Sequence, residues 1–153
     1  MPRRKLLLAA ALLPESHLQG HVEVGLGAVT RAHHNLIAVQ ERPRIGDSLD
    51  LDSATAQELA ESNRWDYVLS VPDAFQLVGL EPHSARDSEI GTVIAKKEAA
   101  AQYLREHLAP GIHIARWYWV SGGPARFSIM ESARRRLDKH GILFRGRMIT
   151  SLD

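Results

Sequence analysis

Hydrophobic and polar residues alternate with a period of two in several short segments of this chain, which is typical of β-strands. The segment "HVEVGLGAV" shows this alternation, and "NLIAVQERP" has the apolar composition of a second strand ended by Pro43, so residues 20–45 are predicted to form a pair of strands. The next segment, "RIGDSLDLD", is polar and is interpreted as a connection. The segment "SATAQELAES" then predicts a helix, at whose start Thr55 and Glu58 have the spacing of a capping box.

A hairpin and a long helix are predicted in the middle of the chain. The segments "DYVLSV" and "AFQLVGLE" have the composition of strands, and Pro72 and Asp73 between them suit the centre of a type I turn. The segment "DSEIGTVIAKKEAAAQYLREHL" follows, with apolar residues spaced along one face of a helix, and Pro110 and Gly111 end it.

The last third of the chain predicts a strand in "IHIARWYWVSGG", a basic helix over residues 128–140, and a closing strand in "ILFRGRMI". From residue 53 the order is helix, strand, strand, helix, strand, helix, strand. This order predicts an α/β protein with a mixed central sheet and flanking helices. No internal repeat is visible, and residues 1–153 suit a single domain in which residues 1–52 form an N-terminal helix and strand extension.

The composition of the chain says more about its possible chemistry than about its fold. The chain contains no cysteine, which excludes disulfides, thiolate nucleophiles and cysteine-ligated zinc. The formal net charge of +1 does not by itself indicate a nucleic-acid partner. Basic residues nevertheless cluster in "PRRK", "AKK", "ARRRLDKH" and "FRGR", which predicts either a basic stripe or several separate solvated faces.

The beginning of the chain, "MPRRKLLLAAALLPES", combines a basic stub with a short apolar run and so resembles a signal peptide. No A-x-A cleavage site follows, and the apolar run is too short to span a bilayer. We therefore expect an amphipathic first element in a cytoplasmic protein without a membrane partner, with secretion as the alternative.

Candidate chemistry begins with the segment "LVGLEPHSA", where an apolar strand runs into a glutamate and a histidine. Side chains of a strand repeat every two residues, so Glu81 and His83 are expected on the same face as Leu77 and Gly79. Glutamate is seldom buried without a partner, which predicts that another charged group meets Glu81. The alternative is a strand that ends in polar residues because it has reached solvent.

A second carboxylate is predicted beside Glu81. If the hairpin loop contains an even number of residues around Pro72 and Asp73, then Asp66 faces Gly79 and lies diagonally across from Glu81. Both carboxylates could then reach one divalent cation, Mg²⁺ or Mn²⁺, in an oxygen-rich site. The alternative is that Asp66 is only the polar residue that starts a strand.

One lysine interrupts the apolar face of the long helix. Lys97 occupies a position where an apolar residue would complete this face, so its side chain is expected to point inward. Its ammonium is predicted either to meet the carboxylates of Asp66 and Glu81 or to snorkel along its stem to the rim. Lys96 lies about 100° around the helix and is expected to face water.

The order of Asp66, a hairpin, then Glu81 and His83, followed by a helix and a strand, resembles the core of the PD-(D/E)xK nuclease-like superfamily. The resemblance covers residues 53–121 and implies a restriction-endonuclease-like αβββαβ-type core within residues 53–153. It also implies that Asp66 and Glu81 bind Mg²⁺ and that a lysine two residues after the second acid helps to activate water.

This chain departs from that pattern because His83 stands where the superfamily has lysine. His83 could replace this lysine as base or ligand, Lys97 could supply its charge from the helix, or the site could be degenerate. The literal "PD" at Pro72 and Asp73 does not fit, because a turn position lies roughly 26 Å along the strand from Glu81.

The leading hypothesis is therefore a metal-dependent nuclease-like protein that hydrolyses phosphodiester bonds of DNA or RNA. The candidate catalytic residues are Asp66, Glu81, His83 and Lys97. The basic helix would contact phosphates through Arg134, Arg135, Arg136 and Lys139. The alternatives are a degenerate fold of the same type that binds nucleic acid or protein, and a metal-independent ribonuclease that uses His83 and Lys97 as acid and base. A homodimer is compatible with each of these hypotheses.

Overall fold

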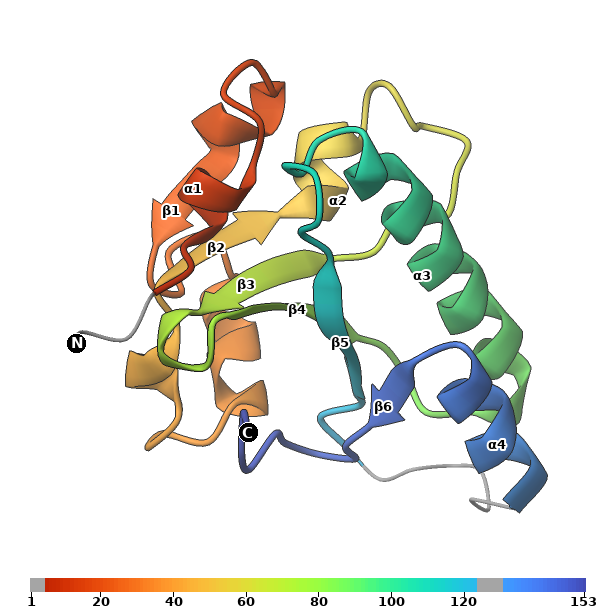
Figure 1. The fold of residues 1–153 in the computed structure, drawn as a ribbon. Helices are drawn as coiled ribbons and strands as arrows, with labels where there is room; N and C mark the ends of the chain where they lie inside the picture. The colour runs from red at the N-terminus through yellow and green to blue at the C-terminus, as the bar shows by residue number, and fades with distance from the viewer. Residues whose placement is uncertain (1–4, 124–130) are drawn as a thin grey trace.

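A computed structural model of the chain describes residues 5–123 and 131–153, which contain one six-stranded sheet (Figure 1). The strands occur in the sheet in the same order as in the chain. Their bounds are β1 (Val22–Val24), β2 (Asp47–Asp50), β3 (Tyr67–Val71), β4 (Gln76–Pro82), β5 (Ile114–Val120) and β6 (Ile142–Phe144). The pairs β1–β2, β2–β3 and β3–β4 are antiparallel, whereas the pairs β4–β5 and β5–β6 are parallel.

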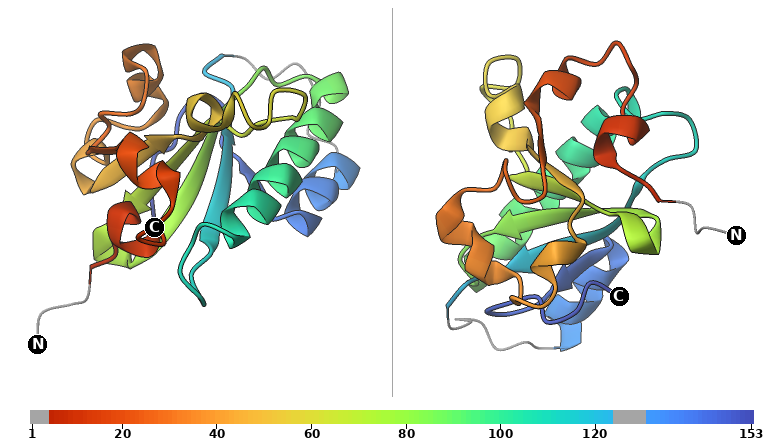
Figure 2. Two further views of the ribbon diagram at one scale, coloured as in Figure 1. Left: turned by 90° about the horizontal axis from the view of Figure 1, so that it is seen from above. Right: turned by 90° about the vertical axis from the view of Figure 1, so that its left-hand side faces the viewer.

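Helices connect the parallel strands: α3 (Ile90–Arg105) lies between β4 and β5, and α4 (Glu131–Lys139) lies between β5 and β6. Two shorter helices, α1 (Leu8–Ala11) and α2 (Leu51–Thr55), occur earlier in the chain. Figure 2 shows α3 and α4 side by side on the same face of the sheet, as expected for two successive right-handed crossovers in one direction. This arrangement confirms the α/β class with a mixed sheet and flanking helices. Within the described residues, no helix combines the length and the apolar character needed to cross a membrane.

Two hydrophobic cores lie on the two faces of the sheet. Helices α1, α3 and α4 cover the first core, whose sheet residues include Val68, Leu77, Trp117 and Trp119. The second core is covered by 3₁₀ turns at Arg31–Leu36 and Arg42–Arg44 and by C-terminal residues; its members include Leu69, Val78, Leu80, Tyr118 and Ile149. The aromatic side chains of β5 therefore serve packing on both faces.

The predicted hairpin is confirmed, but its register differs by two residues. The loop holds four residues, with a 3₁₀ turn at Pro72–Ala74 followed by Phe75 in the left-handed region at φ 52°. Asp73 is exposed there, as expected, and pairs with Arg44. Because the loop is longer than a two-residue turn, Val68 faces Gly79, and the same register places Asp66 directly across from Glu81.

The strand pair predicted for residues 20–45 is wrong in its second member. Strand β1 pairs with β2, which lies in the segment that the sequence indicated was a polar connection. Segment 31–36 is instead a 3₁₀ turn, and Ile37 forms only an isolated bridge. Strand β2 can be buried because the carboxylate of Asp47 accepts hydrogen bonds from the backbone N–H of Leu8 and Ala9 and from the hydroxyl of Ser70, which lie in other parts of the chain.

The predicted capping box of α2 is also wrong. The helix begins earlier, at Leu51, and Asp50 caps it by accepting from the backbone N–H of Ser53. Thr55 is buried at the other end, where its hydroxyl donates to the carbonyl of Leu51. Helix α4 falls within the predicted range 128–140, of which residues 128–130 lie outside the described part of the chain.

Candidate active site

The carboxyl group of Glu81 is fully buried near the end of β4, on the sheet face that α3 covers. Its Oε1 accepts a 3.0 Å hydrogen bond from the backbone N–H of Asp66, and its Oε2 accepts a hydrogen bond from the ammonium of Lys96. A buried carboxylate needs such partners, because removing its charge from water without them costs several kcal/mol. The prediction that a charged group meets Glu81 is therefore confirmed.

The ammonium of Lys96 joins the two acids. Its Nζ also lies 3.6 Å from Oδ1 of Asp66, so one cation contacts both carboxylates. The two carboxylates thus converge as predicted, well within the separation of about 8 Å above which they could not share an ion. The side chain of Lys96 is only 15% exposed, which corrects the expectation that it faces water.

No open space lies beside Glu81 at Gly79. A Cβ atom at Gly79 would lie 2.8 Å from Cε3 of Trp117 and 2.9 Å from Nε1 of Trp65. These two indole rings form an edge-to-face pair with their centroids 5.0 Å apart. Position 79 therefore has to be glycine so that the two indole rings can pack against the backbone beside Glu81. The accessible side of the cluster is the end of β4.

At that end, His83 links Glu81 to a further acid that the sequence did not indicate. Its Nδ1 lies 3.5 Å from Oε2 of Glu81, and its Nε2 lies 2.8 Å from Oε2 of Glu89, just before α3. The indole N–H of Trp119 donates to the carbonyl of His83 and fixes this part of the backbone. Glu81 and, less strongly, Glu89 raise the pKa of His83 above its ordinary value, although partial burial opposes this rise.

The electrostatic surroundings of Asp66 are strongly acidic. Burial raises the pKa of its carboxyl to about 7, the charge of Glu81 adds to this rise, and the ammonium of Lys96 opposes it. Asp52 and Asp50 on α2 and β2 contribute smaller repulsions in the same direction as Glu81. A second positive charge at this position would therefore be stabilised by carboxylates that one lysine only partly neutralises.

Lys97 does not join the cluster, which corrects its predicted contact with the acids. It does lie on the core face of α3, among Val93, Ile94 and Leu104. Its side chain, however, extends across Trp117, with the ammonium 5.8 Å from the ring centroid and 3.7 Å from Oε1 of Glu98. Lys97 therefore stays largely buried against Trp117 with its ammonium directed toward the exposed Glu98, whereas Lys96, at the flank of the face beside Ala100, reaches the carboxylates.

The predicted phosphate-binding residues are all exposed on α4 but do not share one direction. Arg134 lines a pocket against β6, whereas Nη2 of Arg136 lies 3.6 Å from the position of a Cβ atom at Gly91, at the beginning of α3. These two arginines lie about 200° apart around the helix. Arg135 and Lys139 contact neither of these places.

Metal binding at this site would depend on Asp66 and Glu81. Among the residues that the structure describes, no three histidine or acidic side chains are arranged to hold a metal ion. Mg²⁺, however, is commonly held by one or two carboxylates, with water and substrate phosphate oxygens as its remaining ligands. The pair of acids around Lys96 matches that donor set. Comparison of the chain with models of protein families, with characterised proteins and with solved structures finds no match.

The dependence of Glu81 on Lys96 can be tested by mutation. Lys96→Met keeps most of the stem volume but leaves a buried carboxylate without its charged partner. We expect the free energy of unfolding, measured by denaturant titration, to fall by about 3–5 kcal/mol.

Lys97→Met is the matched control, because the ammonium of Lys97 pairs with the exposed Glu98 and lies over the ring of Trp117. We expect the free energy of unfolding of this variant to change by no more than about 1 kcal/mol. The double variant Glu81→Gln with Lys96→Met should recover part of the stability lost in Lys96→Met. Equal losses for the two lysine variants would contradict the account.

The raised pKa of Asp66 predicts a pH dependence of stability. Because the folded state binds the Asp66 proton more tightly than the unfolded state does, ionising this group destabilises the fold as pH rises from about 4 to about 7. Asp66→Asn should therefore gain stability relative to the wild type across this range, by up to about 1.4 kcal/mol per pH unit.

Chemical unfolding of both proteins at a series of pH values measures this gain. Asp73→Asn serves as control: the exposed Asp73 has a lowered pKa because of Arg44, so its stability difference should be constant above pH 5. A constant difference for Asp66→Asn as well would show that its carboxyl titrates normally.

Proposed function

We propose that this chain is a metal-dependent phosphodiesterase of nucleic acids, with its active site at Asp66, Glu81, His83 and Lys96. The observation that carries the proposal is the position of the Lys96 ammonium, which contacts both carboxylates at the carboxyl end of β4. In α/β sheets, ligands commonly bind beyond the carboxyl ends of the parallel strands. A place that accommodates one cation between two acids also suits a divalent cation.

Asp66 and Glu81 are the residues that would hold the ion. A bound Mg²⁺ or Mn²⁺ would supply an activated water and would stabilise the negative charge that builds on the attacked phosphate. The backbone N–H of Asp66 keeps Oε1 of Glu81 in place, so Oε2 is the oxygen left to exchange one cation for another.

Lys96, instead of Lys97, would supply from the helix the charge of the lysine that the nuclease resemblance places at position 83. If a metal ion displaces the ammonium from Oε2 of Glu81, Lys96 is still held on α3 beside the two acids. Its ammonium can then donate to a phosphate oxygen. Lysine is suited to this exchange, because its flexible stem allows the ammonium to move while α3 stays fixed.

His83 is assigned the role of proton donor instead of base. Both of its ring nitrogens face carboxylates, and its pKa is raised, so the imidazolium form persists to higher pH than in a free histidine. An imidazolium at the rim of the site can protonate the oxygen that leaves when the phosphodiester bond breaks. The metal-independent ribonuclease hypothesis loses its acid and base pair, since Lys97 points to Trp117 and Glu98.

One observation favours the alternative, a catalytically degenerate nuclease-like fold that only binds nucleic acid or protein. Both oxygens of Glu81 already accept hydrogen bonds within the chain. A closed cluster of this kind can serve stability alone, and in that case no divalent cation would compete with Lys96.

Calorimetric titration with Mn²⁺ and Mg²⁺ separates the two functions. The proposal predicts binding of one ion per chain that is lost in Glu81→Gln, together with cleavage of a DNA or RNA substrate that stops on addition of a chelator. Glu98→Gln is the matched control, because Glu98 is an exposed acid on α3, the helix that carries Lys96, and among the described residues it forms ion pairs with Lys97 and His140; this variant should retain both activities. Cleavage that persists in chelator, or metal binding that survives Glu81→Gln, would contradict the proposal.

A further inference from the structure

A pocket of about 210 Å³ lies between the second half of α3 and the beginning of β5. Its position follows from the lengths of the neighbouring elements. Strand β6 begins opposite Trp117, so the first residues of β5 extend beyond it. Helix α4 ends at Lys139, and the next residue, His140, contacts Glu98 in the middle of α3. The last turns of α3 and the start of β5 therefore project past α4 and β6, and the pocket lies between them.

The floor of this pocket is apolar, whereas positive charge lies on its wall. The floor consists of side chains that belong to the first hydrophobic core or pack against it: Leu104, Leu108, Ile112, Ile114 and Trp117. Lys97 and Arg105 of α3 also line the pocket, and within the described part of the chain its lining includes no acid. A ligand that fills the pocket would therefore bury apolar surface beside a cation.

Lys97, which the candidate active site does not use, is the cation closest to this floor. Its ammonium lies 5.8 Å from the ring centroid of Trp117, and its side chain is only 16% exposed, so packing holds its stem in place. The ion pair of Lys97 with Glu98 spans 3.7 Å, which is longer than a hydrogen bond. The same oxygen of Glu98 lies 2.7 Å from Nδ1 of His140. The ammonium of Lys97 therefore retains N–H groups that can donate to an anion in the pocket.

We propose that this pocket binds a small carboxylate with an apolar body, such as a medium-chain fatty acid, whose carboxylate contacts the ammonium of Lys97. The apolar body gains free energy by leaving water for the floor, and the carboxylate gains a charge-assisted hydrogen bond. A single negative charge suits the site, because every further charge that leaves water adds to the cost of binding. The pocket is smaller than the roughly 300–1,000 Å³ of sites for drug-sized ligands, so the ligand is correspondingly small.

This pocket is separate from the proposed active site. Ile114 pairs with Leu77 at the beginning of the parallel strands, whereas Trp119 pairs with Glu81 near their end. A strand rises about 3.3 Å per residue, which puts the two places roughly 16 Å apart along β5. The inference therefore does not rest on the proposed function and can be tested on a chain that does or does not cleave nucleic acid.

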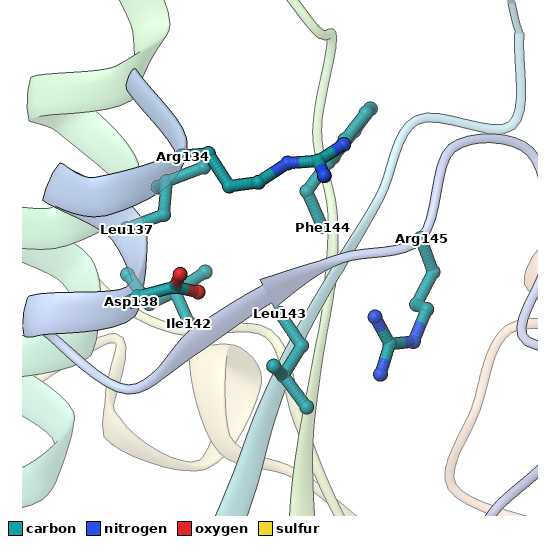
Figure 3. Close-up of a pocket in the computed structure, with 7 residues that line it drawn as sticks. All are labelled: Arg134, Leu137, Asp138, Ile142, Leu143, Phe144 and Arg145. Atoms are coloured by element: carbon teal, nitrogen blue, oxygen red, sulfur yellow. The ribbon is translucent and has the colours of Figure 1, made fainter. Parts of the chain in front are cut away.

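A second pocket provides a control of similar size. It measures about 240 Å³ and lies between α4 and β6, where Arg134 and several apolar side chains surround it (Figure 3). Asp138 also lines this pocket, and the guanidinium of Arg145 lies over the ring of Tyr118, which belongs to the core on the other face of the sheet. The charge of Arg134 is thus balanced by an acid in the same pocket, and we expect no selection of an anion there.

Calorimetric titration with octanoate, below the concentration at which it forms micelles, tests the proposal. Octanol, which has the same chain without the charge, and acetate, which has the charge without the chain, should each bind at least about tenfold more weakly than octanoate. Lys97→Met removes the cation and keeps most of the stem, so it should weaken octanoate binding by about tenfold. Lys97→Arg keeps the charge and should bind octanoate within about threefold of the wild type.

Arg134→Met is the matched control, because it removes one positive charge from the pocket of Figure 3; it should change octanoate binding by less than about twofold. Ala101→Phe tests the apolar part of the site independently. Ala101 lines the pocket, and a larger side chain there would occupy the space of the apolar body while Lys97 stays unchanged, so octanoate binding should be lost. Thermal unfolding of each variant checks that it is folded.

Any of three results would overturn the inference. The first is that the wild type does not bind octanoate. The second is that octanol or acetate binds as tightly as octanoate, which would leave an apolar patch without charge selection or an anion site that does not use the floor. The third is that Lys97→Met and Arg134→Met lose the same affinity, which would show that octanoate responds only to the total charge of the chain.

Discussion

The fully buried carboxyl group of Glu81 is the constraint on which the arrangement of this sheet and its helices depends. A carboxylate at this depth is stable only if its partners are already in place when it is removed from water. The register of β3 against β4 supplies the backbone N–H of Asp66, and the position of α3 supplies the ammonium of Lys96. The loop length of the hairpin and the rotation of α3 about its axis must therefore both be compatible with one buried charge.

The same constraint explains how the charges of the proposed active site are arranged. Asp66 and Glu81 lie close enough to repel each other, and a single ammonium separates them. His83 and Glu89 continue the cluster toward solvent, so the buried end holds charge in fixed positions while the other end is accessible.

The hairpin and the pair of acids could be predicted from the sequence, because local patterns of residues determine them. The hairpin follows from two apolar runs around Pro72 and Asp73, and the buried Glu81 follows from a carboxylate at the end of an apolar strand. The convergence of Asp66 with Glu81 required only that the loop contain an even number of residues; a loop of four instead of two shifted the register by two but kept the face.

The rest depends on contacts between distant segments. Lys96 and Lys97 differ by about 100° around α3, and their roles depend on how the helix is rotated against the sheet, which the apolar spacing alone does not determine. Strand β2 could not be predicted because it contains the charged Asp47. The groups that allow Asp47 to be buried, the N–H groups of Leu8 and Ala9 and the hydroxyl of Ser70, are far away in the chain. Glu89 likewise becomes part of the site only through the fold that brings it to His83.

The central claim is that the Lys96 ammonium stands where a divalent cation binds. A crystal structure of the protein soaked in Mn²⁺, with anomalous data collected at the manganese edge, tests it most directly. The account predicts an anomalous peak between the carboxylates of Asp66 and Glu81, with the Lys96 ammonium withdrawn from Oε2 of Glu81. A structure without manganese at these residues, in which Lys96 still contacts both acids, would contradict it and would leave the cluster a stabilising ion pair.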